Sequence, residues 1–391
     1  MRRAADRSPR VRRTTVAILL LNVAVLAAVC VEVGARIVLY AMPYVRPDYR
    51  VHADGYAGAD WTAPYYREFM ESGDVDWRPY VYWRRRPYAG TYINIDQEGI
   101  RRTWSAADGG GSGRRPRIFV MGGSTVWGTG ARDDHTIPSQ LARSLSERGR
   151  NASVVNYGES GYVTGQSVAA LLTALRRGDV PDVVTFYAGA EDVFSAFQNG
   201  AAGLPENEEN RRLEFNATQP ESIRQVFAVM TAGSQRLGLL LQRMRSSGAR
   251  ETAATVSPAT GKMAASAVEQ MCANVRIASA LGAHYRFHVS FYLQPTIFTK
   301  PTLTPYEQRE RDRYETSAAL FAAAYAAIED GACRDLDVHD ISRLFERESR
   351  PLYVDAFHLT EDGNVRVAAV IAADVAGLIG RPDAAVAAAT R

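Results

Sequence analysis

A serine that could act as a nucleophile lies in the stretch RIFVMGGSTVWG, residues 117–128. Ser124 follows two glycines, at the end of an apolar run that predicts a buried strand. Open α/β sheets place reactive groups beyond the carboxyl ends of their strands. Ser124 is therefore a candidate nucleophile, and a serine that only ends a strand is the alternative. Val126 replaces the second glycine of the G-x-S-x-G nucleophile elbow, which disfavours an α/β-hydrolase.

A base and an acid for such a serine occur together in YVDAFHLTEDGN, residues 353–364. A nucleophilic serine needs a base to take its proton and an acid to orient that base. Asp355 and His358 are three residues apart in a non-periodic, glycine-flanked stretch, an arrangement that no other of the six histidines has. For the remaining histidines we expect packing in a strand (His284, His288), local hydrogen bonds (His135, His339) or no assigned role (His52).

Two further stretches, NYGESGY at residues 156–162 and FYAGAEDVF at residues 186–194, each follow a predicted strand. Their glycine-bearing loops fall at the carboxyl edge of the expected sheet. A backbone N–H at that edge is suited to stabilise an oxyanion.

In this order, the four stretches resemble the SGNH (GDSL-like) hydrolase family, in a membrane-anchored bacterial form. The resemblance covers residues 117 to about 378 and leaves a middle insertion unmatched. It implies that Ser124 is the nucleophile and contributes its own N–H to the oxyanion hole. It further implies that His358 is the general base, that Asp355 orients it, and that Gly161 is a second oxyanion donor. The implied fold is a flavodoxin-like three-layer α/β/α domain with a central parallel sheet.

The sequence departs from the family pattern at two places. Gly122-Gly123-Ser124 stands where the family usually has Gly-Asp-Ser, a mild change because that aspartate is not a triad member. The family's Gly-x-Asn-Asp appears as Gly189-Ala190-Glu191-Asp192, and an ionised Glu191 has no donor for the oxyanion. Loss of one such donor typically costs about 10²–10³ in rate. A protonated Glu191 would still donate; alternatively it points away, and Ser124 and Gly161 form a two-donor hole.

From residue 117 onward, short apolar strands alternate with longer amphipathic segments, which predicts a parallel sheet covered on both faces. The predicted strands cover residues 118–121, 153–157, 183–187, 284–293 and 336–340. The predicted helices cover residues 137–148, 167–177, 264–280, 306–328 and 361–379. An insertion at about residues 198–262, with an apolar helix near 223–244, has the length of a lid or binding element.

The N-terminus predicts a membrane anchor. Residues 1–13 carry six arginines, and residues 14–40 form a largely apolar segment that is long enough to cross a bilayer. The positive-inside rule places the arginines in the cytoplasm and the rest of the chain outside. We expect an uncleaved signal anchor, because the apolar run resumes after Arg36. A cleaved signal peptide is the alternative.

Residues 41–116 are predicted to form an aromatic-rich N-terminal cap and linker. Their aromatic residues show no periodicity, which indicates an irregular cap packed on the main domain; a carbohydrate-facing or membrane-adjacent surface is the alternative. The run Arg84-Arg85-Arg86 is expected to be solvated, the usual state of such a run, and the alternative is that it holds acidic groups. The remaining expected parts are a hydrolase domain at residues 117–380 and a C-terminal tail at 381–391.

Composition limits the remaining functions. The net charge of +3 is concentrated in the first 13 residues, so the rest of the 391-residue chain is close to neutral, which argues against nucleic-acid binding. The three cysteines show no metal-site spacing, and we expect neither a metal nor a cofactor. Cys272 and Cys333 either pair in an oxidising compartment or are two isolated buried thiols.

These observations predict a serine ester hydrolase, anchored in the cell membrane with its catalytic domain extracytoplasmic. Its expected substrate is an acylated small molecule, glycan or lipid, and we expect it to remove acyl groups from an envelope polysaccharide or lipid. An O-acyltransferase with the same triad is one alternative, in which a sugar hydroxyl replaces water. A non-catalytic binding or scaffold protein with the SGNH fold is another, and Glu191 would then mark the loss of activity.

Overall fold

The computed structural model describes residues 9–45, 48–106, 114–217 and 258–379. The chain divides into two compact units, one of residues 1–47 with 210–250 and one of residues 48–209 with 251–391. The helix predicted near residues 223–244 lies outside the described residues.

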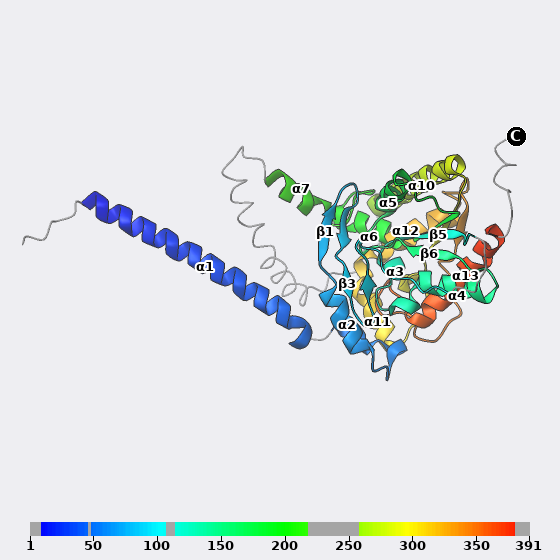
Figure 1. Cartoon of the computed structure of the whole chain (residues 1–391), viewed down its shortest axis with the longest axis horizontal. Helices are drawn as coiled ribbons and strands as arrows, with labels where there is room; N and C mark the ends of the chain where they lie inside the picture. The colour runs from blue at the N-terminus through cyan, green and yellow to red at the C-terminus, as the bar shows by residue number, and fades with distance from the viewer. Residues whose placement is uncertain (1–8, 46–47, 107–113, 218–257, 380–391) are drawn as a thin grey trace, which may run out of the picture. The chain divides into compact units, whose positions relative to one another are not determined.

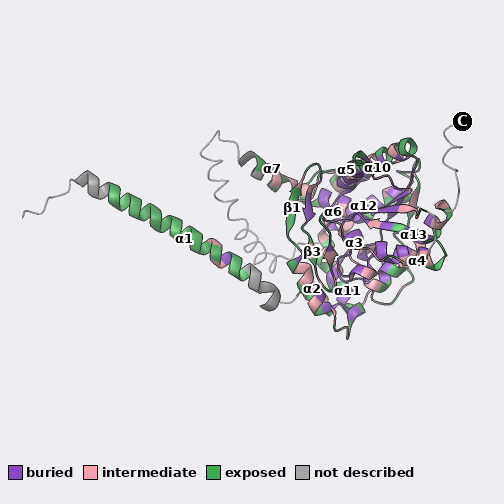
Figure 2. Ribbon diagram, in the orientation of Figure 1, coloured by how far each residue is buried: buried purple, intermediate pink, exposed green. Residues whose placement is uncertain are grey.

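A long helix, α1 (Pro9–Val45), belongs to the first unit (Figure 1). Within it, Thr14–Val38 is long and apolar enough to cross a membrane, and its large apolar side chains are exposed (Figure 2). Polar side chains in this span bond within the helix: Asn22 donates to the Ile18 carbonyl at 2.8 Å, and Arg36 pairs with Glu32 at 2.9 Å. The predicted apolar segment is therefore part of one continuous helix.

The second unit is built on a five-stranded parallel sheet with the order β6-β5-β7-β8-β9. The strands are β5 (Arg117–Gly122), β6 (Ser153–Asn156), β7 (Val183–Ala188), β8 (His288–Leu293) and β9 (Val338–Asp340). In chain order this is the 2-1-3-4-5 arrangement of flavodoxin-like folds. The prediction of an α/β fold with a central parallel sheet is confirmed. Because the strands are parallel, the loops after their carboxyl ends meet at one edge.

Helices cover both faces of the sheet, because the central strands are apolar at successive positions and successive side chains face opposite sides. Ile118 and Val120 of β5 pack in one cluster with residues of α4 (Ile137–Glu147) and α13 (Glu361–Leu378). Phe119 and Met121 pack in the other cluster, with residues of α5 (Thr164–Arg176), α10 (Pro258–Tyr285) and α12 (Glu315–Glu329). This alternation accounts for the layered arrangement in Figure 1.

Two sequence expectations are corrected. His284 does not lie in a strand: α10 continues to Tyr285, the strand begins at His288, and the His284 side chain is exposed. The single helix expected at residues 306–328 is two helices, α11 (Pro305–Arg313) and α12, separated at Tyr314. The Tyr314 ring packs edge-on against Phe194 and Phe357, with ring centroids 6.0 and 5.2 Å away, so the break directs this side chain inward.

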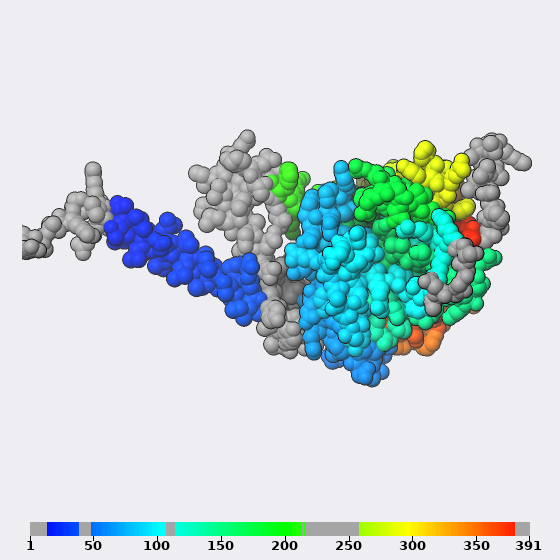
Figure 3. Space-filling view, in the orientation of Figure 1, coloured from blue at the N-terminus to red at the C-terminus, as the bar shows by residue number. Residues whose placement is uncertain are grey.

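Residues 48–106, here called the cap, pack on the sheet domain as an irregular layer. Their regular elements are α2 (Thr62–Glu71) and two hairpins, β1 (Val75–Arg78) with β2 (Tyr82–Arg85) and β3 (Tyr88–Ala89) with β4 (Asn94–Ile95). Tyr65 and Tyr66 of α2 are buried in one cluster with Trp127. In the space-filling view, the blue atoms of the cap form a continuous surface with the cyan and green atoms that follow (Figure 3).

The expectation of a solvated arginine run is wrong for two of its three members. Arg84 and Arg85 are each only 5% exposed, whereas the Arg86 side chain is 55% exposed. Strand alternation does not explain this pattern. The guanidiniums of Arg84 and Arg85 bind buried groups of the protein instead. Among the described residues, the Arg86 side chain pairs with the exposed carboxylates of Asp74 and Asp76.

Cys272 of α10 and Cys333 form a disulfide, with Cα atoms 5.7 Å apart. The structure therefore has the disulfide and not two isolated buried thiols. His339 lies beside Asp337, a local partner, and also beside Asp374. The expectation of a local partner is wrong for His135, which lies 3.2 Å from the sequence-distant Glu361. The other short elements described are α3 (Ser124–Trp127), α6 (Ala190–Asn199), α7 (Glu208–Ala217), η1 (Tyr49–His52), η2 (Asp54–Tyr56), η3 (Asp133–His135) and η4 (Ile297–Thr299).

Candidate active site

Ser124 lies where β5 ends and the short helix α3 begins. The helix starts at Ser124 itself, and Gly123 (φ −90°, ψ −145°) turns the chain from strand to helix. Its hydroxyl therefore lies at the carboxyl edge of the sheet. This is the edge where reactive groups of open α/β sheets are found.

The loop before α13 brings Asp355 and His358 to the same edge. The loop is closed by a hydrogen bond from the Val354 N–H to the His358 carbonyl at 2.9 Å. Asp355 Oδ1 accepts the backbone N–H groups of Phe357 and His358 at 3.0 and 2.9 Å, so the carboxylate caps its own turn. The three-residue spacing thus brings Asp355 Oδ2 within 2.7 Å of His358 Nδ1.

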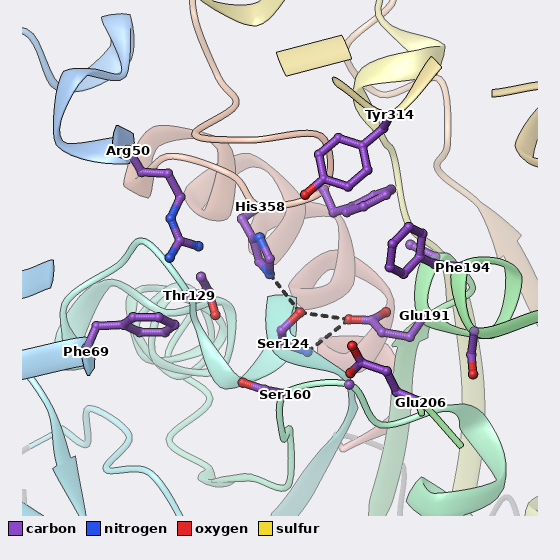
Figure 4. A pocket seen from close by; sticks show the side chains of 14 residues that line it. Arg50, Phe69, Ser124, Thr129, Ser160, Glu191, Phe194, Glu206, Tyr314 and His358 are labelled. Carbon is purple, nitrogen blue, oxygen red and sulfur yellow. Dashed lines mark hydrogen bonds between the residues drawn. The ribbon is translucent and has the colours of Figure 1, made fainter. Parts of the chain in front are cut away.

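His358 bridges the acid and the serine. Its Nε2 is 2.7 Å from Ser124 Oγ, although the two residues are 234 positions apart in the sequence. The structure therefore brings together Ser124, His358 and Asp355 in the order that a proton relay requires. Figure 4 shows the contact between His358 and Ser124.

The electrostatics of Asp355 favour its ionised form. Burial alone would raise its pKa, but the charge and hydrogen bonds of His358, together with the positive charge of Arg50, outweigh it. The pKa of Asp355 consequently lies well below its ordinary value. An ionised Asp355 accepts the Nδ1–H of His358 and leaves Nε2 free to take the serine proton.

Arg50, in the cap, is a site residue that sequence reasoning missed. Its Nη1 is 3.4 Å from Asp355 Oδ2, and it is held by two hydrogen bonds to Asp48 at 2.9 and 2.7 Å. Its guanidinium also lies 5.0 Å from the ring centroids of Tyr66 and Phe69. No local pattern marks Arg50, because Asp355 is 305 positions away.

Glu191 points at Ser124 and not away from it. Its Oε1 accepts the Ser124 backbone N–H at 2.9 Å and lies 3.0 Å from Ser124 Oγ (Figure 4). The family-derived oxyanion donor Ser124 N–H is therefore already engaged by this carboxyl group. Burial raises the pKa of Glu191, against the opposing influence of His358 and of the bonds to Ser124.

Gly123 makes room for Glu191. A Cβ atom built on Gly123 would lie 2.0 Å from Glu191 Oε1 and 2.2 Å from its Cδ, which no real side chain tolerates. The aspartate that the family usually has at this position could not coexist with Glu191 in its present place. The two departures from the family pattern are thus in direct contact.

Gly161 lines the same pocket as Ser124 and Glu191. It has φ +74°, in the left-handed region that favours glycine. A Cβ atom there would also lie 2.1 Å from Glu206 Oε2. Position 161 therefore requires glycine both for its backbone conformation and for the closeness of Glu206.

The pocket at Ser124 has a volume of about 250 Å³. Phe194, Tyr314 and Phe357 form an aromatic wall, with ring centroids 5.2 to 6.0 Å apart. The remaining polar lining comes from different parts of the second unit, namely Arg50, Thr129, Ser160, Ser195 and Glu206. Sequence reasoning missed these residues as well, although Phe357 adjoins His358 and Glu206 lies in the expected insertion.

Residues 120–366 match the GDSL-like Lipase/Acylhydrolase family. The chain belongs to this family, and it is a GDSL-family esterase or acylhydrolase, an enzyme of ester hydrolysis. No curated protein matches.

Among solved structures, the chain is similar to the lipase/acylhydrolase from Enterococcus faecalis, at 16% identity over 67% of this chain and 96% of that one, with a TM-score of 0.35. It is also similar to the acetyl xylan esterase AlAXEase, at 13% identity over 66% and 99% of the two chains, with a TM-score of 0.34. A member of the lipolytic G-D-S-L family from Veillonella parvula has 13% identity over 66% and 97%, with a TM-score of 0.37.

Proposed function

We propose that this protein is a membrane-anchored, extracytoplasmic serine esterase that removes short acyl groups from an envelope polysaccharide or lipid. Its catalytic residues are Ser124, His358 and Asp355. The observation that carries this proposal is the unbroken chain of contacts from Asp355 Oδ2 through the imidazole to Ser124 Oγ, with both distances 2.7 Å.

In the first step, Ser124 Oγ attacks the ester carbonyl carbon while His358 Nε2 takes the hydroxyl proton. Asp355 stabilises the resulting imidazolium, since its carboxylate is ionised and bonded to Nδ1. The carbon–oxygen bond to the leaving alcohol then breaks, and His358 donates its proton to that oxygen. Water, deprotonated by His358, attacks the acyl-serine in the same way and releases the acid and Ser124.

The negative charge on the carbonyl oxygen requires donors. We propose that the Gly161 N–H is one of them, and that the Ser124 N–H becomes the second when the substrate oxygen replaces Glu191 Oε1 as its acceptor. Glu191 is the third in its protonated form. A protonated Glu191 can donate where an ionised one would repel the oxyanion. Its burial, which raises its pKa, supports this form.

The proposed location rests on the N-terminus and on the cysteines. The span Thr14–Val38 has the length and hydropathy of a membrane helix, and six arginines precede it. The disulfide between Cys272 and Cys333 fits an oxidising compartment outside the cytoplasm. We propose an uncleaved anchor at residues 14–40, followed by the cap and linker at 41–116 and the hydrolase domain at 117–380.

The size of the acyl group follows from the pocket. Pockets for drug-sized ligands measure roughly 300–1,000 Å³, so a cavity of about 250 Å³ suits a short acyl chain. The aromatic wall of Phe194, Tyr314 and Phe357 would contact its apolar end. An envelope substrate is proposed because the anchored site would act outside the membrane that holds it.

The proposal is tested on the full-length chain in detergent, with a fluorophosphonate probe and a series of esters of increasing acyl length. We expect labelling at Ser124, none in Ser124→Ala, and a kcat/KM that is highest for two- to four-carbon esters. Absence of labelling in folded wild-type protein would contradict the esterase mechanism. A maximum at long chains would contradict only the short-acyl substrate, and acyl transfer to an added sugar in preference to water would identify an acyltransferase.

The location is tested separately by a reporter fused after Arg391. We expect reporter activity only in the extracytoplasmic compartment, with the fusion in the membrane fraction at its uncleaved mass. A cytoplasmic reporter would overturn the topology, and a shortened soluble product would show a cleaved signal peptide instead of an anchor.

A further inference from the structure

Strand β2 of the cap lies against the loop of residues 157–161, which contains the proposed oxyanion donor Gly161. The indole N–H of Trp83 donates to the Ser160 carbonyl at 3.0 Å. The Arg84 guanidinium donates to two further carbonyls of this loop, at 2.9 and 3.2 Å. The loop is therefore bound by groups that lie more than 70 positions earlier in the chain.

Arg85 binds this loop through its backbone and its side chain. Its backbone N–H donates to Glu159 Oε2 at 2.9 Å, and its Nη2 donates to Ser160 Oγ at 3.1 Å. The other oxygen of Glu159 accepts the Ser160 N–H at 2.8 Å and lies 3.6 Å from Arg85 Nε. Both side chains are buried, with 6% and 0% of their surfaces exposed. Removing one partner of such a pair leaves an uncompensated buried charge.

The same guanidinium contacts the segment that carries Ser124. Arg85 Cζ lies 3.9 Å from the centroid of the Trp127 ring, in the helix that begins at Ser124. Arginine stacks well on aromatic faces and also forms planar hydrogen bonds, a combination that lysine does not provide. One cap residue thus touches both segments that supply backbone donors to the proposed oxyanion hole.

We propose that Arg85 is a positioning residue: through Glu159 and Ser160 it holds the Gly161 N–H at the distance from Ser124 that the oxyanion requires. This inference rests on the proposed function. A misplacement of about 1 Å in a catalytic group can cost about 10²-fold in rate. The cap then contributes to catalysis. Arg85 affects the rate by positioning Gly161, without itself touching substrate.

The test compares Arg85→Lys and Arg85→Ala with Arg86→Ala, an exposed neighbour that pairs only with Asp74 and Asp76 among the described residues. Fluorophosphonate titration of the full-length proteins counts active sites, so kcat is obtained per reactive serine. We expect kcat per site to fall about tenfold in Arg85→Lys and about 10²-fold in Arg85→Ala, with KM nearly unchanged. Arg86→Ala should match the wild type. Added guanidinium ion should restore part of the activity of Arg85→Ala.

A purely structural role would lower the number of titratable sites and leave kcat per site unchanged, and that result would overturn the proposal. If the Arg85 variants do not fold, Ser160→Ala carries the test, because it removes only the hydroxyl that accepts from Arg85. Because Ser160 also lines the pocket, the expected result is a several-fold loss in kcat per site with KM nearly unchanged. No loss, or a change in KM alone, would overturn the proposal. Wild-type protein that is not labelled at Ser124 would instead contradict the esterase mechanism itself.

Discussion

On one side of Ser124 Oγ lies the imidazole of His358, with Nε2 at 2.7 Å, and on the other lies the carboxyl group of Glu191, with Oε1 at 3.0 Å. The His358 side follows the family pattern, with Asp355 three residues earlier. The Glu191 side departs from it twice, at Glu191 and at Gly123. Since a Cβ atom on Gly123 would lie 2.0 Å from Glu191 Oε1, these two departures form one structural change.

The two neighbours of Ser124 Oγ also restrict which of the three side chains carries a proton. The hydroxyl of Ser124 has one proton and two neighbouring acceptors. If it donates to a neutral His358, the contact with Glu191 is a hydrogen bond only when Glu191 is protonated. If it donates to an ionised Glu191, His358 must be protonated to bond Oγ, and it cannot then act as the base. The proposed mechanism therefore requires the form with a protonated Glu191.

The largest effect is expected on the His358 side. Ser124→Ala and His358→Ala should each lower kcat by about 10⁶-fold, and the double variant should be hardly worse, because residues that act as a unit are not additive. Asp355→Asn should cost about 10⁴-fold, because the imidazole tautomer changes. Steady-state kinetics on one activated ester measure these losses. Near-normal turnover by folded Ser124→Ala would show that another residue is the nucleophile.

A smaller effect is expected on the Glu191 side. The wild type should lose activity as the pH rises through the pKa of Glu191, which burial raises, because the ionised group repels the oxyanion. Glu191→Asn restores a permanent donor, so it should keep its activity at alkaline pH and exceed the wild type there by up to about 10²-fold. Paired pH–rate profiles measure this. Both proteins keep the same triad, so only the difference between the curves is assigned to Glu191, and identical curves would remove Glu191 from the oxyanion hole.

The contact between the two departures predicts a measurable coupling. Gly123→Ala should lower kcat/KM in the wild-type background, because the added Cβ displaces Glu191 from Ser124. In a Glu191→Ala background the same substitution should cost much less. The double-mutant cycle is expected to give a coupling energy of about 1–3 kcal/mol, which is typical of residues in contact. Additive effects would mean that Glu191 does not need the space above Gly123.

The smallest effect concerns stability. Burial raises the pKa of Asp192 to about 7, against the opposing bonds from Thr164, so the neutral carboxyl favours the folded state. This contribution is fully present below the ordinary aspartate pKa and is lost as the pH rises through about 7. The Tm should therefore fall between pH 5 and pH 8, by about 2–4 °C per kcal/mol lost.

Asp192→Asn is the matched variant for this measurement, because its amide oxygen still accepts from Thr164. It should reduce the fall in Tm without abolishing it, since Glu191 and Glu310 also have raised pKa values. Melting curves of the two proteins at several pH values provide the comparison. Equal slopes would show that Asp192 is ionised in the folded protein throughout this range.

Local features of the sequence were sufficient for the central parts of the five strands and for the Asp355–His358 pair. Apolar runs alternate with amphipathic segments, and this periodicity predicts a parallel sheet whatever the distant contacts are. Asp355 and His358 are three residues apart, and the turn between them is closed by hydrogen bonds within the loop. Such contacts depend on neighbours in the chain, so spacing alone predicts them.

Tertiary structure alone decided which polar side chains are buried and what they face. Arg85 and Arg86 are neighbours of the same type, yet only Arg85 meets a buried carboxylate, that of Glu159, 74 positions later. Glu191 could have pointed away, but the turn at Gly123 leaves space beside the Ser124 N–H. The parallel sheet brings distant loops to one edge, and this determines which side chains become partners. Because these loops are far apart in the chain, their ion pairs and hydrogen bonds leave no repeating pattern in the sequence. The sequence by itself therefore determined the sheet and the local catalytic turn, and folding determined the oxyanion environment around them.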